Sequence, residues 1–485
     1  MKEQLDLEKI KNSLDIKNHD ITERTIPFRR GAVKLFYIKQ LTDRTTLSET
    51  VIKPLVVRCT YEKRNLKAQM TTDEIIFADD CRVESDIRKI KTHILSGMVV
   101  ILFSTDVEYV VVNLKKVEHR PVPTPRLQYT IRGPQDCFTE NLEVNLSLLR
   151  YRLKDDNLQI KRFEVGKRTK SNVAVIYIED IANDTVVKEL QKRIESIDVD
   201  GIGESGELES YLLNSKRQLF PNIGLLERSD MAFHSLLEGK VLVMIDGSGV
   251  ALLAPRTFSE FFHSCDDRYD NKYFGFFSRM LRYAALFIAF TGSSFFVAFT
   301  SFHTDALPTN YVILLSEMRS NVPFTSFIGA MIIEFIMELL RESLTRVPKQ
   351  IGSAIGIVGA IVIGQAAIAA GVFSPLLLII ASVSLLASFA IPDYSLLNAF
   401  RILKIILLIF TGALGFFGFS LFITLILAQL VSLNSFGVPY MAPWAPFNFY
   451  DFKRSFIRNT TDDLKRPAFL RTKNKIRARE KADNK

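Results

Sequence analysis

The stretch IGSAIGIVGAIVIGQAAIAAG, residues 351–371, decides the fold class. It has no charged residue and is apolar enough to enter a bilayer. Small residues at four-residue spacing allow the backbones of neighbouring membrane helices to approach closely, so we expect a helix that packs against other helices. The alternative is a generic glycine-rich membrane helix, because Gly is frequent in such helices. The small residues are Gly352, Gly356, Ala360 and Gly364 on one face and Gly359, Ala367 and Gly371 on a second.

Apolar residues are concentrated around this stretch, between Ala284 and Val431, while the first 283 residues have the composition of a soluble protein. A chain of 485 residues is long enough for two or three domains. The predicted fold class is therefore an α/β soluble region of two similar subdomains followed by an all-α polytopic membrane domain of four to six helices.

A pattern that occurs twice predicts the two subdomains. The strand-like segments VKLFYIK (33–39) and VAVIYIED (173–180) each lead into a helical pattern. Each is followed further on by an apolar strand, a turn and a second apolar strand, at 95–114 and at 237–255. The second turn, Asp-Gly-Ser-Gly at 246–249, is typical of a β-hairpin and lacks the Lys-Ser/Thr continuation of a phosphate-binding loop.

These patterns define six regions. They are a polar N-terminal arm (1–30), a first cytoplasmic α/β subdomain (31–135), a linking helix (136–165), a second cytoplasmic α/β subdomain (166–270), a transmembrane domain (271–450) and a basic cytoplasmic tail (451–485).

Charge and cysteine usage indicate where the soluble parts lie. The net charge is +9, and residues 451–485 alone hold twelve Lys or Arg against five Asp or Glu. A basic tail beside a membrane block favours contact with anionic lipid over nucleic acid. The four cysteines precede the membrane block without CxxC spacing, which favours reduced thiols in the cytosol. The charged N-terminus has no signal-peptide core, so we expect the first 283 residues in the cytoplasm.

The membrane block predicts several crossings. Arg401 and Lys404 are interpreted as an inner loop, and Gly412, Gly415 and Gly418 as breaks in a 27-residue apolar run that is longer than one crossing needs. The positive-inside rule favours an even number of crossings, six if 322–340 spans the bilayer and four if it does not. The candidate segments are 284–303, 322–340, 354–372, 374–391 and 405–431, with Ser374-Pro375 as the turn of a tight hairpin.

No catalytic constellation, cofactor motif or metal-binding spacing stands out, so we expect no enzyme and no cofactor. Glu334 and Glu338 lie one turn apart in an apolar helix, where a carboxylate at mid-helix costs roughly 2.5 to 3.5 kcal/mol. One hypothesis is an acidic ring that favours cations in an oligomer; the other is that Glu338 pairs with Arg341 or Arg346 at the inner interface. Gln365 either lines a pore or hydrogen-bonds to a neighbouring helix.

Several blocks resemble the A subunit of GerA-type spore germinant receptors, in the order found in that family. The resemblance runs from about Phe28 to Asn448, which is nearly the whole chain. The blocks include IRGPQDCFTENLEVNLSLLRYRLKDDNL, FPNIGLLERSDMAFHSLLEGKV, VPKQIGSAIGIVGAIVIGQAAIAAGVFSP and SFGVPYMAPWAPFN.

The resemblance implies a germinant receptor subunit in the inner membrane of bacterial spores, with its N-terminal region in the cytoplasm. Its implied partners are a transporter-like B subunit that senses nutrient, a C lipoprotein and further copies of itself. The resemblance also implies that the copies of the A subunit form an ion channel that opens when germinant binds B. The chain departs from the family at Gly329, where many relatives have Glu, and at Arg341–Leu344. The alternatives are a subunit like the paralogous stage V sporulation protein AF, a non-conducting membrane scaffold, and a secondary transporter, for which the membrane block shows no inverted repeat.

Overall fold

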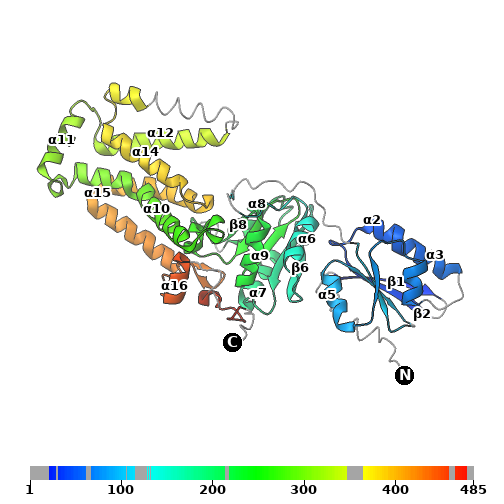
Figure 1. Cartoon of the computed structure of the whole chain (residues 1–485). Coiled ribbons are helices and arrows are strands. Elements are labelled where there is room, and N and C mark those ends of the chain that lie inside the picture. The colour runs from blue at the N-terminus through cyan, green and yellow to red at the C-terminus, as the bar shows by residue number, and fades with distance from the viewer. Residues whose placement is uncertain are drawn as a thin grey trace. The chain divides into compact units, whose positions relative to one another are not determined.

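The computed structural model describes residues 21–28, 31–61, 67–104, 106–114, 128, 130, 133–213, 218–346, 364–457 and 465–477. The chain forms two compact units (Figure 1). The first comprises residues 1–216, 223–255 and 464–485, and the second comprises residues 217–222 and 256–463.

The first unit contains two five-stranded antiparallel sheets with the same topology, which confirms the predicted pair of similar α/β subdomains. The strand orders are β1-β2-β4-β5-β3 and β6-β7-β9-β10-β8, so each strand of one sheet has a counterpart in the other. The first sheet consists of β1 (Ile21–Phe28), β2 (Gly31–Ile38), β3 (Cys81–Glu84), β4 (Val99–Phe103) and β5 (Tyr109–Val112), and the second of β6 (Leu158–Val165), β7 (Ser171–Ile178), β8 (Gly224–Leu226), β9 (Val241–Ile245) and β10 (Ala251–Ala254).

The two hairpins predicted from the repeat are present. β4 pairs with β5, and β9 pairs with β10 across the Asp-Gly-Ser-Gly turn. Their strands are buried throughout, which explains why they read as continuous apolar runs rather than alternating ones.

The first strand of each sheet lies outside the subdomain boundaries drawn from the sequence. β1 falls in the segment assigned to the polar arm, and β6 falls in the segment assigned to the linking helix. Both are edge strands that carry two consecutive charged residues, Glu23-Arg24 in β1 and Lys161-Arg162 in β6, so neither stands out in the sequence as an apolar run. Their partners are β2 and β7, whose pairing runs over eight residues in each case.

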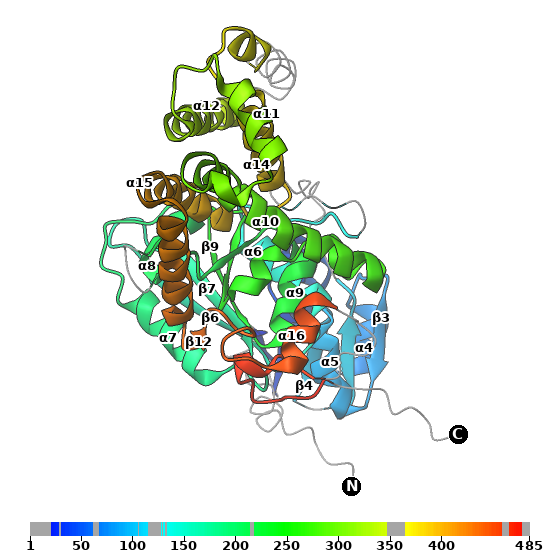
Figure 2. The same ribbon diagram turned by 90° about the vertical axis from the view of Figure 1, so that its left-hand side faces the viewer.

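Helices cover the sheets. In the first subdomain the chain after β2 winds through α2 (Arg44–Thr46) and a π-helical segment (Leu47–Ile52) into α3 (Lys53–Tyr61). The core of the second sheet is formed by its strands with α6 and α9 (Figure 2). The remaining helices of the first unit are α4 (Ala68–Glu74), α5 (Ile90–Leu95), α6 (Leu142–Arg152), α7 (Asp184–Glu195), α8 (Ser205–Leu212) and α9 (Ser229–Glu238).

The segment 465–477 of the basic tail packs on the second subdomain. The backbone N–H of Lys473 donates to the Ile181 carbonyl (3.1 Å), and the Lys473 ammonium pairs with Asp184 (2.8 Å). The Arg466 guanidinium donates to the Leu237 carbonyl (2.9 Å). This part of the tail therefore adds to the fold of the soluble unit.

The second unit is helical. Its long elements are α10 (Lys272–Ser301), α11 (Thr309–Arg319), α12 (Ser326–Arg346), α14 (Pro375–Phe389), α15 (Tyr394–Ser432) and α16 (Phe449–Phe456). Residues 364–369 are helical and lead into α14 with Ser374 as its N-cap, so the predicted turn at Ser374-Pro375 is confirmed. Most of the glycine-rich stretch, residues 351–363, lies outside the described residues.

α15 bends sharply at Gly415, one of the glycines expected to break this run. Gly415 has φ 62° and ψ −142°, which are not helical angles. In a straight helix Phe410 and Phe422 would lie about 18 Å apart along the axis, yet their rings stack with centroids 5.0 Å apart. The element therefore consists of two arms, 394–414 and 416–432, that contact each other.

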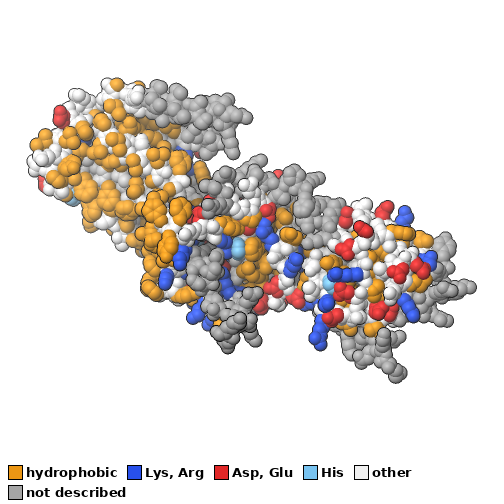
Figure 3. Space-filling view, viewed as in Figure 1, with side chains coloured by type: hydrophobic (Ala, Val, Ile, Leu, Met, Phe, Trp, Pro, Cys, Tyr) orange, Lys and Arg blue, Asp and Glu red, His pale blue; other side chains and the backbone are white. Residues whose placement is uncertain are grey.

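The surface of the helical unit is apolar. Two of its helices, α10 and α15, are long and apolar enough to cross a membrane, and α14 is a shorter apolar helix. In Figure 3 hydrophobic side chains are spread over the visible face of this unit and few charged side chains appear there, while Lys, Arg, Asp and Glu are spread over the other unit. The exposed apolar side chains include Phe287, Ile379, Val383, Leu386, Ile409, Phe417 and Leu425.

Candidate functional site: a charged cluster inside the helical unit

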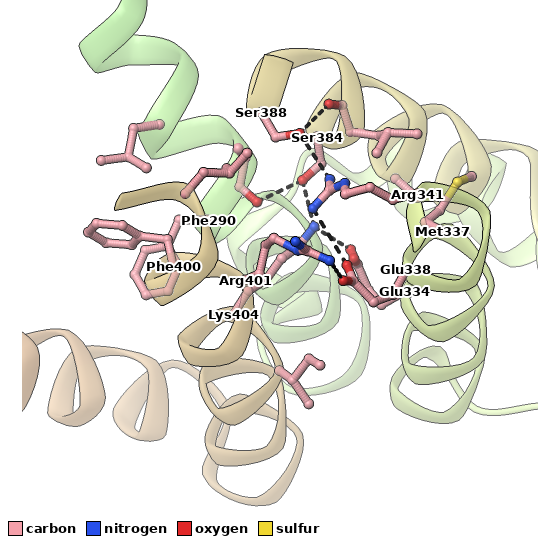
Figure 4. Close-up of a pocket in the computed structure, with 16 residues that line it drawn as sticks. Phe290, Glu334, Met337, Glu338, Arg341, Ser384, Ser388, Phe400, Arg401 and Lys404 are labelled. Atoms are coloured by element: carbon pink, nitrogen blue, oxygen red, sulfur yellow. Dashed lines mark hydrogen bonds and ion pairs between the residues drawn. The ribbon is translucent and has the colours of Figure 1, made fainter. Parts of the chain in front are cut away.

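The charged cluster forms where α12, α14 and α15 meet α10. On α12, Glu334, Glu338 and Arg341 are spaced four and three residues apart, which places them on one helix face. On α15, Arg401 and Lys404 are three residues apart for the same reason. Figure 4 shows the two carboxylates of α12 and the two cations of α15 pointing toward one another.

Glu334 is the more enclosed of the two carboxylates. Its Oε1 lies 2.7 Å from the Lys404 ammonium, and the Ser293 hydroxyl of α10 donates a hydrogen bond to the same carboxylate. Lys404 also donates to the Ser384 hydroxyl (2.8 Å), which in turn donates to the Ala289 carbonyl (2.8 Å). The chain of contacts links four helices through one ion pair.

Glu338 lies one turn closer to the end of α12 and is about a third exposed. It forms ion pairs with Arg401 of α15 and with Arg341 of its own helix, the latter at 3.5 Å. Arg341 also donates to the Ser388 hydroxyl of α14 (2.9 Å). The predicted Glu338–Arg341 pair is thus present, and Arg401 is a further partner.

Electrostatics explains why these charges occur inside an apolar helical unit. An isolated charge is costly in such surroundings, whereas a paired and hydrogen-bonded charge is tolerated. Each of the five charged groups in the cluster has an opposite charge within reach, and three serines supply further hydrogen bonds. The cluster therefore fastens α12 and α15 together and ties α10 and α14 to them.

Arg401 and Lys404 correct one interpretation of the sequence. Both residues lie within α15, which begins at Tyr394, and not in a loop between crossings. The physical reason is that Glu334 and Glu338 neutralise them inside the unit. Their three-residue spacing, and the four-residue spacing of Ser384 and Ser388, are the sequence signals that mark the shared polar face.

The other predicted site residues are placed differently. A Cβ at Gly364 would lie 3.5 Å from Leu378 of α14, so this glycine faces its neighbour in the hairpin. Gln365 is exposed. Gly352, Gly356 and Gly359 lie outside the described residues. Of the predicted site residues, Glu334 and Glu338 lie together in the charged cluster. A pore-lining role for any of these residues stays a prediction.

The described residues contain no group of three or more His, Cys, Asp or Glu side chains arranged to hold a metal ion. The contacts observed within the cluster are ion pairs and hydrogen bonds.

Comparison with known proteins places the chain among proteins of spore germination. The chain is 34% identical over 444 residues to "Spore germination protein KA" of Bacillus subtilis (strain 168), covering 91% of this chain and 81% of that protein. It is 37% identical over 466 residues to "Spore germination protein B1" of the same organism, covering 96% of each. It is 34% identical over 484 residues to "Spore germination protein GerLA" of Bacillus cereus, covering 98% and 97%.

One solved structure is similar in part. It is the crystal structure of the N-terminal domain of the A subunit of the Bacillus megaterium spore germinant receptor GerK3, with a TM-score of 0.39 and 23% identity over 52% of this chain and 94% of that one. The family model described as Bacillus/Clostridium GerA spore germination protein matches residues 8–469. The chain therefore belongs to the GerA family of spore germination proteins, as its sequence blocks indicate.

Proposed function

We propose that this chain is the A subunit of a nutrient germinant receptor in the inner membrane of the spore. In this proposal several copies form an ion channel that opens when germinant binds a transporter-like B subunit, and a C lipoprotein completes the complex. The proposal assigns no catalytic reaction to the chain. Support comes from the family, whose members here are named spore germination proteins, and from the construction of the helical unit.

The observation that carries the proposal is the distribution of polarity in the helical unit. Exposed apolar patches larger than a few hundred Å² are rare on soluble monomers and mark membrane or partner surfaces. Here such side chains cover α10, α14 and α15, while the charges of α12 and α15 converge on the interior. This is the arrangement expected of helices that face lipid outside and one another inside.

Contacts among the helix ends support a membrane topology. Arg256, just before α10, pairs with Asp393 at the start of α15 (2.7 Å). The Arg256 backbone N–H also donates to the Ser435 hydroxyl oxygen (3.2 Å), and the Phe258 backbone N–H donates to the Tyr440 carbonyl (2.8 Å). The segment that leads into α10 and both ends of α15 therefore lie at the same end of the helical unit.

The opposite end of the unit is formed by a second group of contacts. The hydroxyls of Thr300, near the end of α10, and Ser326, at the start of α12, are 2.9 Å apart. The bend of α15 is also here, because a Cβ at Gly415 would lie 2.8 Å from the Phe302 ring. Since the chain enters and leaves the helical unit at one end, we infer an even number of crossings, with α11 on the far side.

The tail gives independent support for this topology. Residues 465–477 pack on the second subdomain, which precedes the helical unit in the chain. Both soluble segments must then lie on one side of the membrane. The charge excess of the tail supports the assignment of that side to the cytoplasm.

Ion flux through liposomes tests the channel proposal. The chain would be purified with its B and C partners and reconstituted, and nutrient-triggered cation release would be recorded beside the size of the complex. We expect flux from a defined oligomer, and a change in its rate in Gly364→Leu, because the larger side chain must displace Leu378. Ala366→Leu, at an exposed position two residues away, is the matched control.

The same experiment separates the channel from a scaffold. A complete complex that releases no cations in the presence of nutrient would contradict the channel and favour a non-conducting scaffold. Equal flux from the wild type and from Gly364→Leu would show that the glycine-rich hairpin is not part of the element that conducts ions.

A further inference from the structure

A small cavity lies beside the charged cluster, among α10, α12, α14 and α15. Its volume is about 40 Å³, which is room for a few water molecules. Three cations and two carboxylates line it, so the charges of its wall sum to +1. The cations are Arg341, Arg401 and Lys404, and the carboxylates are Glu334 and Glu338.

Arg341 has a donor that none of the described residues satisfies. Its side chain is nine-tenths buried, and its two terminal nitrogens contact Glu338 and Ser388. Its Nε–H is buried and has no hydrogen-bond partner among the described residues. A buried donor without an acceptor costs free energy, and at a charged group the cost is larger. An acceptor at this position would remove that cost.

The chemistry of the wall indicates what the acceptor is. An excess positive charge, two guanidinium groups and the hydroxyls of Ser384 and Ser388 suit an anion with several oxygens. Arg binds phosphate through parallel N–H···O bonds, and basic pockets between helices at the cytoplasmic side of a membrane bind lipid head groups. Glu334 pairs with Lys404, and the two arginines share the single carboxylate of Glu338, so together the arginines keep one positive charge for the anion.

The position of the cavity suits a lipid. Arg341 and Ser388 lie near the ends of α12 and α14, the ends that the topology places toward the cytoplasm. Beside them, Leu386 and Phe389 of α14 are exposed, and the Phe389 ring lies 5.9 Å from the Arg341 guanidinium carbon. Acyl chains of a lipid held at the cavity would follow this apolar surface.

We propose that the cavity binds the phosphate of an anionic phospholipid, held between Arg341 and Arg401. The proposal rests on the membrane placement argued above and not on ion conduction. The bound lipid adds a negative charge to a wall of net charge +1, and so completes the neutralisation that Glu334 and Glu338 begin.

Lipid retention by the full-length purified chain tests this site. Phosphatidylglycerol would be titrated into the detergent-solubilised protein, and bound lipid counted by native mass spectrometry. We expect the apparent affinity to fall about tenfold or more in Arg341→Gln and in Arg401→Gln, because each loses charge-assisted hydrogen bonds. Lys272→Gln, which removes an exposed cation from the start of α10, is the matched control and keeps the wild-type affinity.

A conservative variant and a competing ligand complete the test. Arg341→Lys retains the charge but not the planar guanidinium group. If the phosphate is held as proposed, the lipid affinity of this variant lies between those of the wild type and Arg341→Gln. Thermal unfolding verifies that each variant is folded. Inorganic phosphate is added as a competitor: no displacement identifies the lipid as the source, and displacement at millimolar concentration identifies free phosphate as the ligand of the same cavity.

Equal retention of phosphatidylglycerol by wild type, Arg341→Gln, Arg401→Gln and Lys272→Gln would overturn the proposal. This result is independent of conduction, because retention is counted on detergent-solubilised protein. A wild type that retains lipid but conducts no ions would contradict the channel and leave the lipid site standing.

Discussion

The soluble and helical units of the chain differ in the side chains that cover their surfaces. In the soluble unit the strands β4, β5, β9 and β10 are buried along their whole length, and exposed ion pairs such as Lys167–Asp198 lie on the surface. In the helical unit many exposed side chains of α10, α14 and α15 are Phe, Leu, Ile or Val, and Glu334 and Lys404 pair inside.

In the proposed membrane placement, each unit is folded for its own solvent. Water stabilises an exposed charge, so an ion pair on the soluble unit adds little. Lipid gives no such stabilisation, so a charge in the helical unit needs a partner of opposite sign. The predictions below test this comparison, beginning with the largest expected effect.

Removal of one member of the buried pair has the largest effect. Lys404→Met leaves the Glu334 carboxylate buried with a single hydroxyl donor, and we expect the free energy of unfolding to fall by about 3 to 5 kcal/mol. Lys167→Met in the soluble unit is the matched control and costs less than about 1 kcal/mol. Denaturant unfolding in detergent measures both.

The double variant Glu334→Gln with Lys404→Met separates charge from packing. It leaves no unpaired charge, so most of the lost stability returns. A double variant as unstable as Lys404→Met would contradict the electrostatic explanation.

Introduction of a charge at an exposed apolar position has the next largest effect. Val383 in α14 and Val57 in α3 are exposed to similar extents, 46% and 52%. Val383→Asp faces lipid and costs about 2.5 to 3.5 kcal/mol, so less protein is recovered in the membrane fraction. Val57→Asp faces water, so the amount of this variant recovered equals that of the wild type. Equal recovery of the two variants would show that the exposed faces of the two units do not face different solvents.

The bend of α15 gives a smaller, steric effect. Gly415 and Gly437 both have positive φ, but a Cβ at Gly415 would overlap the Phe302 ring, whereas none of the described atoms lies within 4 Å of one at Gly437. Gly437→Ala therefore measures backbone strain alone, and Gly415→Ala should cost about 1 to 3 kcal/mol more. Thermal unfolding compares them. Similar costs would show that the Phe302 contact is not formed.

The tail contact gives the smallest effect. Lys473 and Asp184 form an exposed ion pair, so Lys473→Ala should cost less than about 1 kcal/mol, and less still at high salt. Hydrogen exchange of residues 465–477 in the full chain should become faster in this variant. Unchanged exchange would show that the backbone contact of Lys473 with Ile181 holds the segment by itself.

The sequence was sufficient to predict features that depend on local pattern. The paired hairpins β4–β5 and β9–β10, the turn before α14 and a break at Gly415 all follow from apolar runs and from Gly or Pro at defined places. β1 and β6 were not predicted, because adjacent charged residues, Glu23-Arg24 and Lys161-Arg162, interrupt the apolar pattern of these two edge strands. Each becomes evident only through its partner strand.

The charged cluster shows a second limit of sequence reasoning. Glu334 and Glu338 stood out because each is a charge in an apolar helix. Their partners Arg401 and Lys404 follow about 65 to 70 residues later, and no local pattern links the two pairs. Periodicity gives the face of a helix, whereas the identity of the facing helix depends on tertiary packing.

The most direct test of the two-solvent account is labelling from the two sides of the membrane. Single cysteines would replace Ser316 on α11, Lys188 on α7 and Lys453 on α16, all exposed, in a cysteine-free full-length chain expressed in cells. An impermeant maleimide should label Ser316→Cys in intact cells, and Lys188→Cys and Lys453→Cys only after permeabilisation. Labelling of Ser316→Cys and Lys453→Cys from the same side would contradict the account.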